Sequence, residues 1–145
     1  MNKYILTFCS LIISYHSFTL SAVGESQIYS PIPLQPNQLI SDTLSSDDIP
    51  TGEGGFAKDY TIFLNKGDQI AIDVMSEDFD TVVMLIAEDG TTVAENDDAP
   101  DHDSNSLLFT RIAETGRYTI RVRAFGAVGN GKFTIQLTKL QPIVN

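Results

Sequence analysis

The chain has 145 residues, and its 19 acidic residues outnumber the nine basic ones, so the formal net charge at pH 7 is −10. Such a chain is repelled by nucleic acid and by anionic membrane surfaces, which excludes both as expected partners. A chain of this size buries about two-thirds of its unfolded surface, so one domain with a substantial core is expected.

Residues 1–24 predict a secretory signal peptide that is not part of the fold. One lysine precedes an apolar run over residues 4–20, and small residues follow, so that cleavage after Ala22 or after Gly24 fits the pattern. The uninterrupted apolar part is shorter than the roughly 20 residues of a membrane span, so no span is expected in the mature chain. An uncleaved N-terminal anchor is the alternative, which the polar interruptions of the run disfavour. We therefore expect a protein that is periplasmic or secreted.

Removal of the signal peptide changes the charge and the cysteine content. The single cysteine, Cys9, leaves with it, so the mature chain forms no disulfide, although an exported protein could. The remaining chain carries eight basic and 19 acidic residues, a net charge of −11.

Residues 25–38 are polar and contain three prolines, so we expect an extended leader that makes few apolar contacts. The domain itself is expected over residues 39–140. A short strand near residues 39–44 precedes a second polar stretch, residues 45–55, whose glycines come before a strand and not before a helix, which excludes a phosphate-binding loop.

From residue 56 onward, apolar and polar residues alternate with the period of two that is typical of strands with one buried face. Between the segments lie turn signals, such as Asp89-Gly90, which predicts a tight hairpin. Residues 81–87 are apolar at nearly every position, which predicts a strand covered on both faces. The predicted strands are residues 39–44, 60–65, 70–75, 81–87, 91–95, 107–112, 118–124 and 132–138. About eight short strands without a helix predict an all-β antiparallel β-sandwich of jelly-roll type.

The most unusual stretch is residues 95–103, which holds five carboxylates, one proline and no basic residue between two predicted strands. Residues 101–105 match the first three ligand positions of an EF-hand. The sixth position, however, is Ser106 where glycine is required, and the twelfth is Ile112 where glutamate is required, so an EF-hand is rejected. Two interpretations remain: a looser calcium site, or a solvated loop held by its own hydrogen bonds. The candidate calcium ligands are Asp97, Asp98, Asp101 and Asp103.

Nothing in the sequence points to catalysis. His102 is the only histidine of the mature chain, which excludes a multi-histidine metal site, and its loop neighbours do not form a positioned triad. A hydrolase that uses surface carboxylates stays an alternative on chemical grounds, although the chain has no tryptophan to stack on a sugar.

Other polar residues have a structural and a functional interpretation. We expect Asp80 to be a buried residue that shapes a turn, Phe79 to pack in the core, and Asn96 to hold a turn by its side chain. The arginines at positions 121 and 123, with Arg117 nearby, are expected on the outward face of one strand. There they either pair with carboxylates across strands or bind an anionic partner, and we favour the pairing.

The order of the motifs resembles the bacterial pre-peptidase C-terminal domain family over residues 39–137. The matching motifs are Asp59-Tyr60, Asn65-Lys66-Gly67-Asp68-Gln69-Ile70, Ser76-Glu77-Asp78-Phe79-Asp80-Thr81, Asp89-Gly90, Glu95-Asn96-Asp97-Asp98, Thr115-Gly116-Arg117-Tyr118-Thr119-Ile120-Arg121-Val122 and Gly131-Lys132-Phe133-Thr134-Ile135. The resemblance implies a non-catalytic β-sandwich that accompanies secreted enzymes, and in some members binds calcium or a polymer such as collagen. We therefore expect a non-catalytic binding or accessory module for an extracellular protein or polymer. The alternatives are a docking subunit of a separately encoded secreted protease and the small hydrolase.

Overall fold

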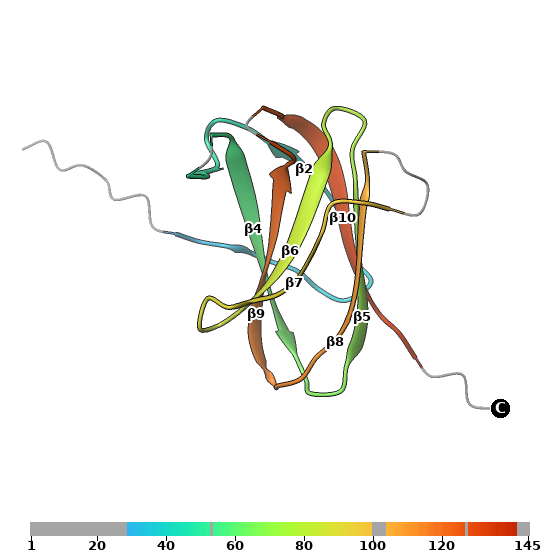
Figure 1. The fold of residues 1–145 in the computed structure, drawn as a ribbon. Coiled ribbons are helices and arrows are strands. Elements are labelled where there is room, and N and C mark those ends of the chain that lie inside the picture. Colours follow the sequence, from blue (N-terminus) through green and yellow to red (C-terminus); the bar gives the residue numbers. More distant parts are fainter. Residues whose placement is uncertain (1–28, 53, 100–103, 127, 142–145) are drawn as a thin grey trace, which may run out of the picture.

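The computed structural model describes residues 29–52, 54–99, 104–126 and 128–141, and these residues form ten strands and no helix (Figure 1). The strands are β1 (Ile32–Pro33), β2 (Leu39–Leu44), β3 (Ile49–Pro50), β4 (Phe56–Leu64), β5 (Gln69–Met75), β6 (Thr81–Ala87), β7 (Thr92–Asn96), β8 (Ser106–Arg111), β9 (Gly116–Ala124) and β10 (Gly131–Lys139). All eight predicted strands are present, and two short strands, β1 and β3, were not predicted.

The strands form two sheets that pack face to face. The first sheet has the order β1-β4-β9-β6-β7, with β3 also paired to β4, and the second has the order β2-β10-β5-β8. All pairings are antiparallel except that of β1 with β4. The predicted all-β sandwich is therefore confirmed. Among the eight longer strands, each passes to the other sheet at every connection except the β6–β7 hairpin, an order that favours the jelly-roll type, which stays a prediction.

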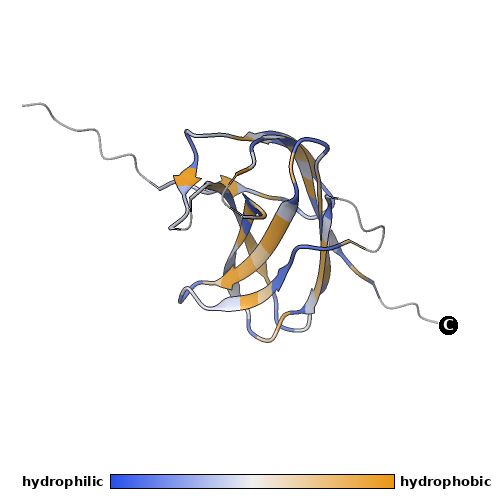
Figure 2. Cartoon of the chain, turned by 45° about the horizontal axis from the view of Figure 1, so that its top comes forward, coloured by the Kyte–Doolittle hydropathy of each residue, from blue (hydrophilic) through white to orange (hydrophobic). Residues whose placement is uncertain are grey.

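The core lies between the two sheets and follows from the alternation in the sequence. On β4, Tyr60, Ile62 and Leu64 are buried, whereas Phe63, which points outward, is 59% exposed. Figure 2 shows the resulting pattern of apolar strands joined by hydrophilic turns. The buried cluster comprises Leu34, Leu44, Tyr60, Ile62, Leu64, Ile70, Ile72, Val74, Phe79, Val83, Leu85, Leu108, Ile112, Tyr118, Ile120, Val122, Ala124, Phe133, Ile135 and Leu137. The predicted core position of Phe79 is confirmed, and its ring meets Phe133 edge to face.

The described part of the polar leader belongs to the sandwich. Its strand β1 pairs with β4 in parallel, with Ile32 opposite Tyr60, and the Leu34 amide donates to the Thr61 carbonyl at 2.9 Å. Leu34 is only 2% exposed. The expectation of few apolar contacts is therefore wrong at Leu34, because one leucine among prolines is enough to fill the open edge between the sheets.

The β6–β7 connection is the hairpin that Asp89-Gly90 predicts. The Ala87 amide donates to the Thr91 carbonyl at 2.8 Å, and Gly90 has φ +86°, a left-handed conformation that glycine adopts without a steric cost. Because β6 lies between β9 and β7, it is protected along both edges. In the described part of the chain, no helix is long and apolar enough to cross a membrane.

Candidate binding groove

An open groove of about 960 Å³ lies over one end of the second sheet. We call it the polar groove. It lies at the end of the sandwich opposite the β4–β5 turn, and it is lined by Ser41, Asp42, Thr43, Met75, Ser76, Glu77, Asp78, Ser104, Asn105, Lys132, Phe133 and Thr134. Strand register sets its floor, because Thr134 on β10 lies between Ser41 on β2 and Met75 on β5.

Ser76 holds the wall of the polar groove together. Its hydroxyl donates to the Lys132 carbonyl at 2.8 Å and accepts from the amides of Asp78 and Phe79 at 3.1 and 3.2 Å. Its amide donates to Asn105 Oδ1 at 3.0 Å. One buried serine thus joins three segments of the wall by hydrogen bonds.

The same wall requires a glycine at position 131. The Lys132 amide donates to Asp78 Oδ2 at 2.7 Å, which brings the β5–β6 loop against the start of β10. Gly131 has φ +136°, and a Cβ atom there would lie 2.4 Å from the Cβ of Asp78. This requirement could not be seen in the sequence, since the two residues are far apart in the chain.

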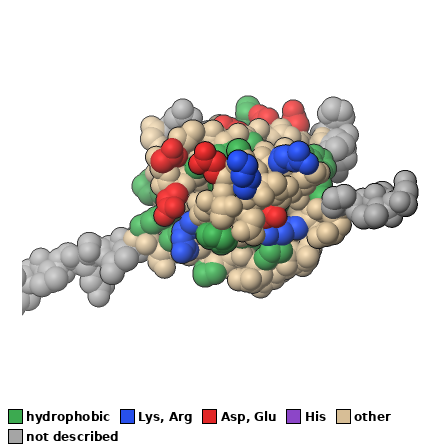
Figure 3. All heavy atoms as spheres, turned by 90° about the horizontal axis from the view of Figure 1, so that it is seen from below, with side chains coloured by type: hydrophobic (Ala, Val, Ile, Leu, Met, Phe, Trp, Pro, Cys, Tyr) green, Lys and Arg blue, Asp and Glu red, His purple; other side chains and the backbone are tan. Residues whose placement is uncertain are grey.

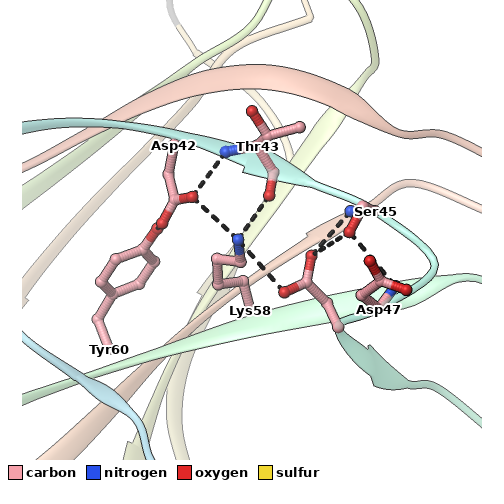
Figure 4. A network of polar contacts seen from close by, with 7 residues as sticks. Asp42, Thr43, Ser45, Asp47, Lys58 and Tyr60 are labelled. Carbon is pink, nitrogen blue, oxygen red and sulfur yellow. Dashed lines mark hydrogen bonds and ion pairs between the residues drawn. The ribbon is translucent and has the colours of Figure 1, made fainter.

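The β2 side of the polar groove is held by an ion network at the edge between the sheets (Figure 4). Lys58 Nζ donates to Asp42 Oδ1 at 2.9 Å and to the Thr43 carbonyl at 2.6 Å, and it lies 3.2 Å from Asp48 Oδ1. The Tyr60 hydroxyl donates to Asp42 Oδ2 at 2.8 Å. β2 and β4 belong to different sheets, so this network fixes the two layers to each other.

Burial and hydrogen bonding shift the pKa values of Asp42 and Lys58 in opposite directions. Burial alone would raise the pKa of Asp42, but hydrogen bonds from Lys58, the Thr43 amide and Tyr60 outweigh it and hold that pKa below its ordinary value. Burial would likewise lower the pKa of Lys58, but its bonds to Asp42 and Asp48 raise it. Both groups are therefore charged at neutral pH.

A second, smaller hollow of about 260 Å³ adjoins the polar groove and shares Met75 and Asn105 with it. We call it the Asp73 hollow. It is lined by Asp73, Val74, Met75, Ala99, Asn105, Ser106 and Leu107. Burial raises the pKa of Asp73, whose carboxylate has no hydrogen-bond donor and no cation within bonding distance among the described residues.

Hydrogen bonds hold the described residues at the start of the acidic stretch and those just beyond it. Asn96 Nδ2 donates to the Leu107 carbonyl at 2.7 Å, and Asn96 Oδ1 accepts from the Asp98 amide at 3.1 Å, so the predicted role of Asn96 in a turn is confirmed. On the other side, Thr81 Oγ1 donates to the Ser104 carbonyl at 3.0 Å and lies 2.6 Å from Ser106 Oγ. The two sheets are thus tied together beside the acidic stretch, a role that its charge did not suggest.

Of the four predicted calcium ligands, Asp97 is half-buried and Asp98 is exposed, whereas Asp101, Asp103 and the neighbouring His102 lie outside the described residues. Within the described ranges, no three acidic, histidine or cysteine side chains converge on one point. The carboxylates of Asp97 and Asp98 are chemically suited to calcium, and the site stays a prediction.

Two arginines of β9, Arg121 and Arg123, pair with carboxylates, as predicted. Arg121 makes a bidentate contact with Asp59, Nε to Oδ1 and Nη2 to Oδ2, both at 2.8 Å, and the Tyr29 hydroxyl donates to Asp59 Oδ2 at 2.6 Å. Arg123 Nη2 donates to Glu95 Oε1 at 2.9 Å. The Asp59 side chain is 1% exposed, so this charge is buried and neutralised.

The prediction that Asp80 is buried is wrong. Asp80 is exposed, and its contribution to the loop is its backbone carbonyl, which accepts from the Phe125 amide at 2.8 Å. The buried residue at this point is Thr81, and the residue that shapes the turn is Ser76. An aspartate and a serine both build such turns, so the sequence did not distinguish them.

Charge is distributed differently at the opposite end of the molecule. Seen from the end with the β4–β5 and β8–β9 turns, acidic and basic side chains lie intermingled on the surface (Figure 3). One of the contacts there joins Lys139 Nζ to Asp68 Oδ2 at 2.6 Å. The polar groove, by contrast, has three carboxylates and one lysine in its lining.

Residues 56–124, which run from the start of β4 to the end of β9, match the family described as "Bacterial pre-peptidase C-terminal domain". This part of the chain is similar to that family. The predicted resemblance is confirmed. β2 and β10, which supply half of the polar groove, lie outside the matched residues of the pre-peptidase C-terminal domain.

Two solved structures share the fold. The pre-peptidase C-terminal domain of the collagenase from Bacillus anthracis is 17% identical, with a TM-score of 0.57, and the match covers 75% of this chain and 95% of that one. PliG of Aeromonas hydrophila, a periplasmic inhibitor of g-type lysozyme, is 11% identical, with a TM-score of 0.52, and the match covers 75% and 96% of the two chains. No curated protein matches the sequence.

Proposed function

We propose that this protein is an exported, non-catalytic binding module that holds a segment of a partner protein in the polar groove. The observation that carries the proposal is the construction of the groove: a floor of strand residues and walls fixed by Ser76 and by the Lys58 network. A site whose groups are already in place loses less entropy on binding than a flexible one.

The chemistry of the lining favours a protein partner. Hydroxyl groups of Ser41, Thr43 and Thr134 and the carboxylates of Glu77 and Asp78 offer hydrogen bonds, and Met75, 52% exposed, offers an apolar contact. The chain has no tryptophan, the residue on which carbohydrates most readily stack. PliG, which has the same fold, is a protein inhibitor of a lysozyme, so the scaffold is compatible with holding a protein.

Export is part of the proposal. The predicted signal peptide is accompanied by a fold found in a periplasmic protein and in a domain of a collagenase. We also propose calcium as a stabilising ion, held by Asp97 and Asp98 together with Asp101 and Asp103. Calcium would supply positive charge to a stretch of five carboxylates.

Capture of a partner from culture supernatant or periplasmic extract tests the function. The variant Thr134→Tyr fills the centre of the groove floor with a residue that favours strands. Its matched control is Thr119→Tyr, at an equally half-buried outward position in the middle of the first sheet. We expect the wild type and Thr119→Tyr to retain the same protein, and Thr134→Tyr to lose it.

Loss in both variants, or in neither, would reject the polar groove as the binding site. Identification of the retained protein as a secreted protease would assign the module to the docking-subunit alternative. A hydrolytic activity of the purified chain that is lost in Asp97→Asn/Asp98→Asn, with folding intact, would favour the hydrolase instead.

A further inference from the structure

Asp73 stands apart from the other carboxylates of the described structure. It lies in the middle of β5 on the outer face of the second sheet, opposite Gln136 on β10 and Leu107 on β8. Its neighbours on the same face of β5 are Ala71 and Met75. Among the described residues, the strand neighbours of this negative charge are therefore all uncharged.

Four other half-buried or buried carboxylates have a cation beside them. Asp42 and Asp48 contact Lys58, Asp59 contacts Arg121, and Asp68 contacts Lys139. Asp73 has no such partner among the described residues, and burial raises its pKa. A carboxylate placed there contributes no bond to the fold and costs desolvation energy, so its charge is available to a group from outside.

The surroundings of Asp73 indicate which group that is. Met75 and Leu107 give the Asp73 hollow an apolar lining. In the adjoining polar groove the carboxylates, Glu77 and Asp78 among them, outnumber the one lysine, Lys132. Lysine and arginine side chains have an apolar stem and a cationic head, which match apolar walls around one carboxylate. We propose that the Asp73 hollow binds a lysine or arginine side chain of the partner segment that lies in the polar groove.

This inference rests on the proposed function and specifies the chemistry of the partner: its segment in the polar groove carries a lysine or an arginine. Because the Asp73 hollow shares Met75 and Asn105 with the polar groove, one extended segment can occupy both. The desolvated carboxylate then acts as the charge that selects the segment, while the hydroxyl-lined floor of the groove contributes hydrogen bonds that any sequence can make.

Nuclear magnetic resonance titration of the ¹⁵N-labelled mature chain tests the inference. The probes are Nα-acetyl-arginine methylamide and its neutral analogue with citrulline, which has nearly the same shape. We expect the arginine probe to shift the amides of residues 73, 75, 105 and 107, and the citrulline probe to bind at least about tenfold more weakly. Asp73→Asn should weaken arginine binding by a similar factor. Glu88→Gln, which removes one charge from the β6–β7 turn, should leave it unchanged.

Equal binding of the two probes, or arginine binding that persists in Asp73→Asn, would overturn the inference. So would shifts confined to residues 95–98, because these would assign the cation to the acidic stretch. Capture by the same variants separates the two proposals. If Thr134→Tyr loses the partner and Asp73→Asn keeps it, the proposed binding function is supported and the requirement for a lysine or arginine in the partner is refuted. If arginine binds at Asp73 while Thr134→Tyr keeps the partner, the function fails.

Discussion

Replacing Lys58 by methionine tests the account of the ion network at the edge of the sandwich. Methionine keeps most of the aliphatic stem but removes the ammonium group, which has three acceptors within 3.2 Å: Asp42, the Thr43 carbonyl and Asp48. The variant therefore leaves two carboxylates close together without their cation, and the Thr43 carbonyl without its donor.

The expected cost lies between that of a surface pair and that of a buried pair. Exposed ion pairs contribute about 0–1 kcal/mol, whereas removing one partner of a buried pair costs about 3–5 kcal/mol. The side chains of Lys58, Asp42 and Asp48 are 17%, 22% and 15% exposed, so water reaches them in part. We expect Lys58→Met to lower the free energy of unfolding by about 2–3 kcal/mol, and the melting temperature by roughly 8–12 °C.

Urea unfolding followed by circular dichroism measures this change, with Lys66→Met, an exposed lysine of the β4–β5 turn, as the control. The control should stay within about 0.5 kcal/mol of the wild type. The pH dependence gives a second measurement. Because the folded-state pKa of Asp42 is depressed, its contribution is present above the unfolded-state value of 3.8 and is lost as the pH falls through the folded value. The difference between the wild type and Lys58→Met should therefore shrink below about pH 4.

A cost below about 0.5 kcal/mol at pH 7 would place this network among the surface pairs and refute the reasoning. A large cost that is the same at pH 7 and pH 3 would refute it in another way, because the loss would then come from packing of the lysine stem and not from charge.

Four further predictions follow from other parts of the structure. Leu34→Ala should lower the free energy of unfolding by about 2–5 kcal/mol, because the side chain is buried in the core, whereas Leu39→Ala, at a side chain 61% exposed, should change it little. Equal effects of the two variants in urea unfolding would contradict the placement of Leu34 in the core. Gly131→Ala should lower the free energy of unfolding by more than about 2 kcal/mol through its clash with Asp78, with Gly52→Ala, where a Cβ meets nothing within 4 Å, as the control. Asp73→Asn should be at least as stable as the wild type at pH 7; because the folded-state pKa of Asp73 is raised, the wild type gains relative stability as the pH falls through that value, and any advantage of the variant should disappear in acid. Calcium at ten times its dissociation constant should stabilise the chain by about 1.4 kcal/mol, reversibly with chelator and not in Asp97→Asn/Asp98→Asn; an unchanged melting temperature at millimolar calcium would reject a physiological site.

Most strands were predictable from the sequence, because the alternation of apolar and polar residues within one short segment decides which face of a strand is buried. Phe133, Ile135 and Leu137 alternate with polar residues, and the structure buries all three. The same local pattern predicted the turn at Asn96 and the outward arginines of β9, since both depend on residues close in the chain or on one strand face.

The groove was not predictable, because it depends on which strands become neighbours. Lys58 lies on the inward side of β4 and interrupts an otherwise apolar face, and only its position across from β2 explains how it is neutralised. Gly131 is required by Asp78, 53 residues earlier in the chain, and Asp73 is isolated only because β8 and β10 present Leu107 and Gln136 to it.

The sequence by itself thus determined an acidic all-β chain, the burial of nearly every strand and the resemblance to a domain family. The tertiary structure decided that Leu34 of the leader completes the core and that Asn96, in the acidic stretch, links the two sheets. It also decided that a groove held by hydrogen bonds lies beside Asp73, a carboxylate without a partner among the described residues. The physical reason is the separation of the interacting residues along the chain. Strand burial depends on residues two positions apart, whereas a site depends on contacts between residues that only the pairing of distant strands brings together.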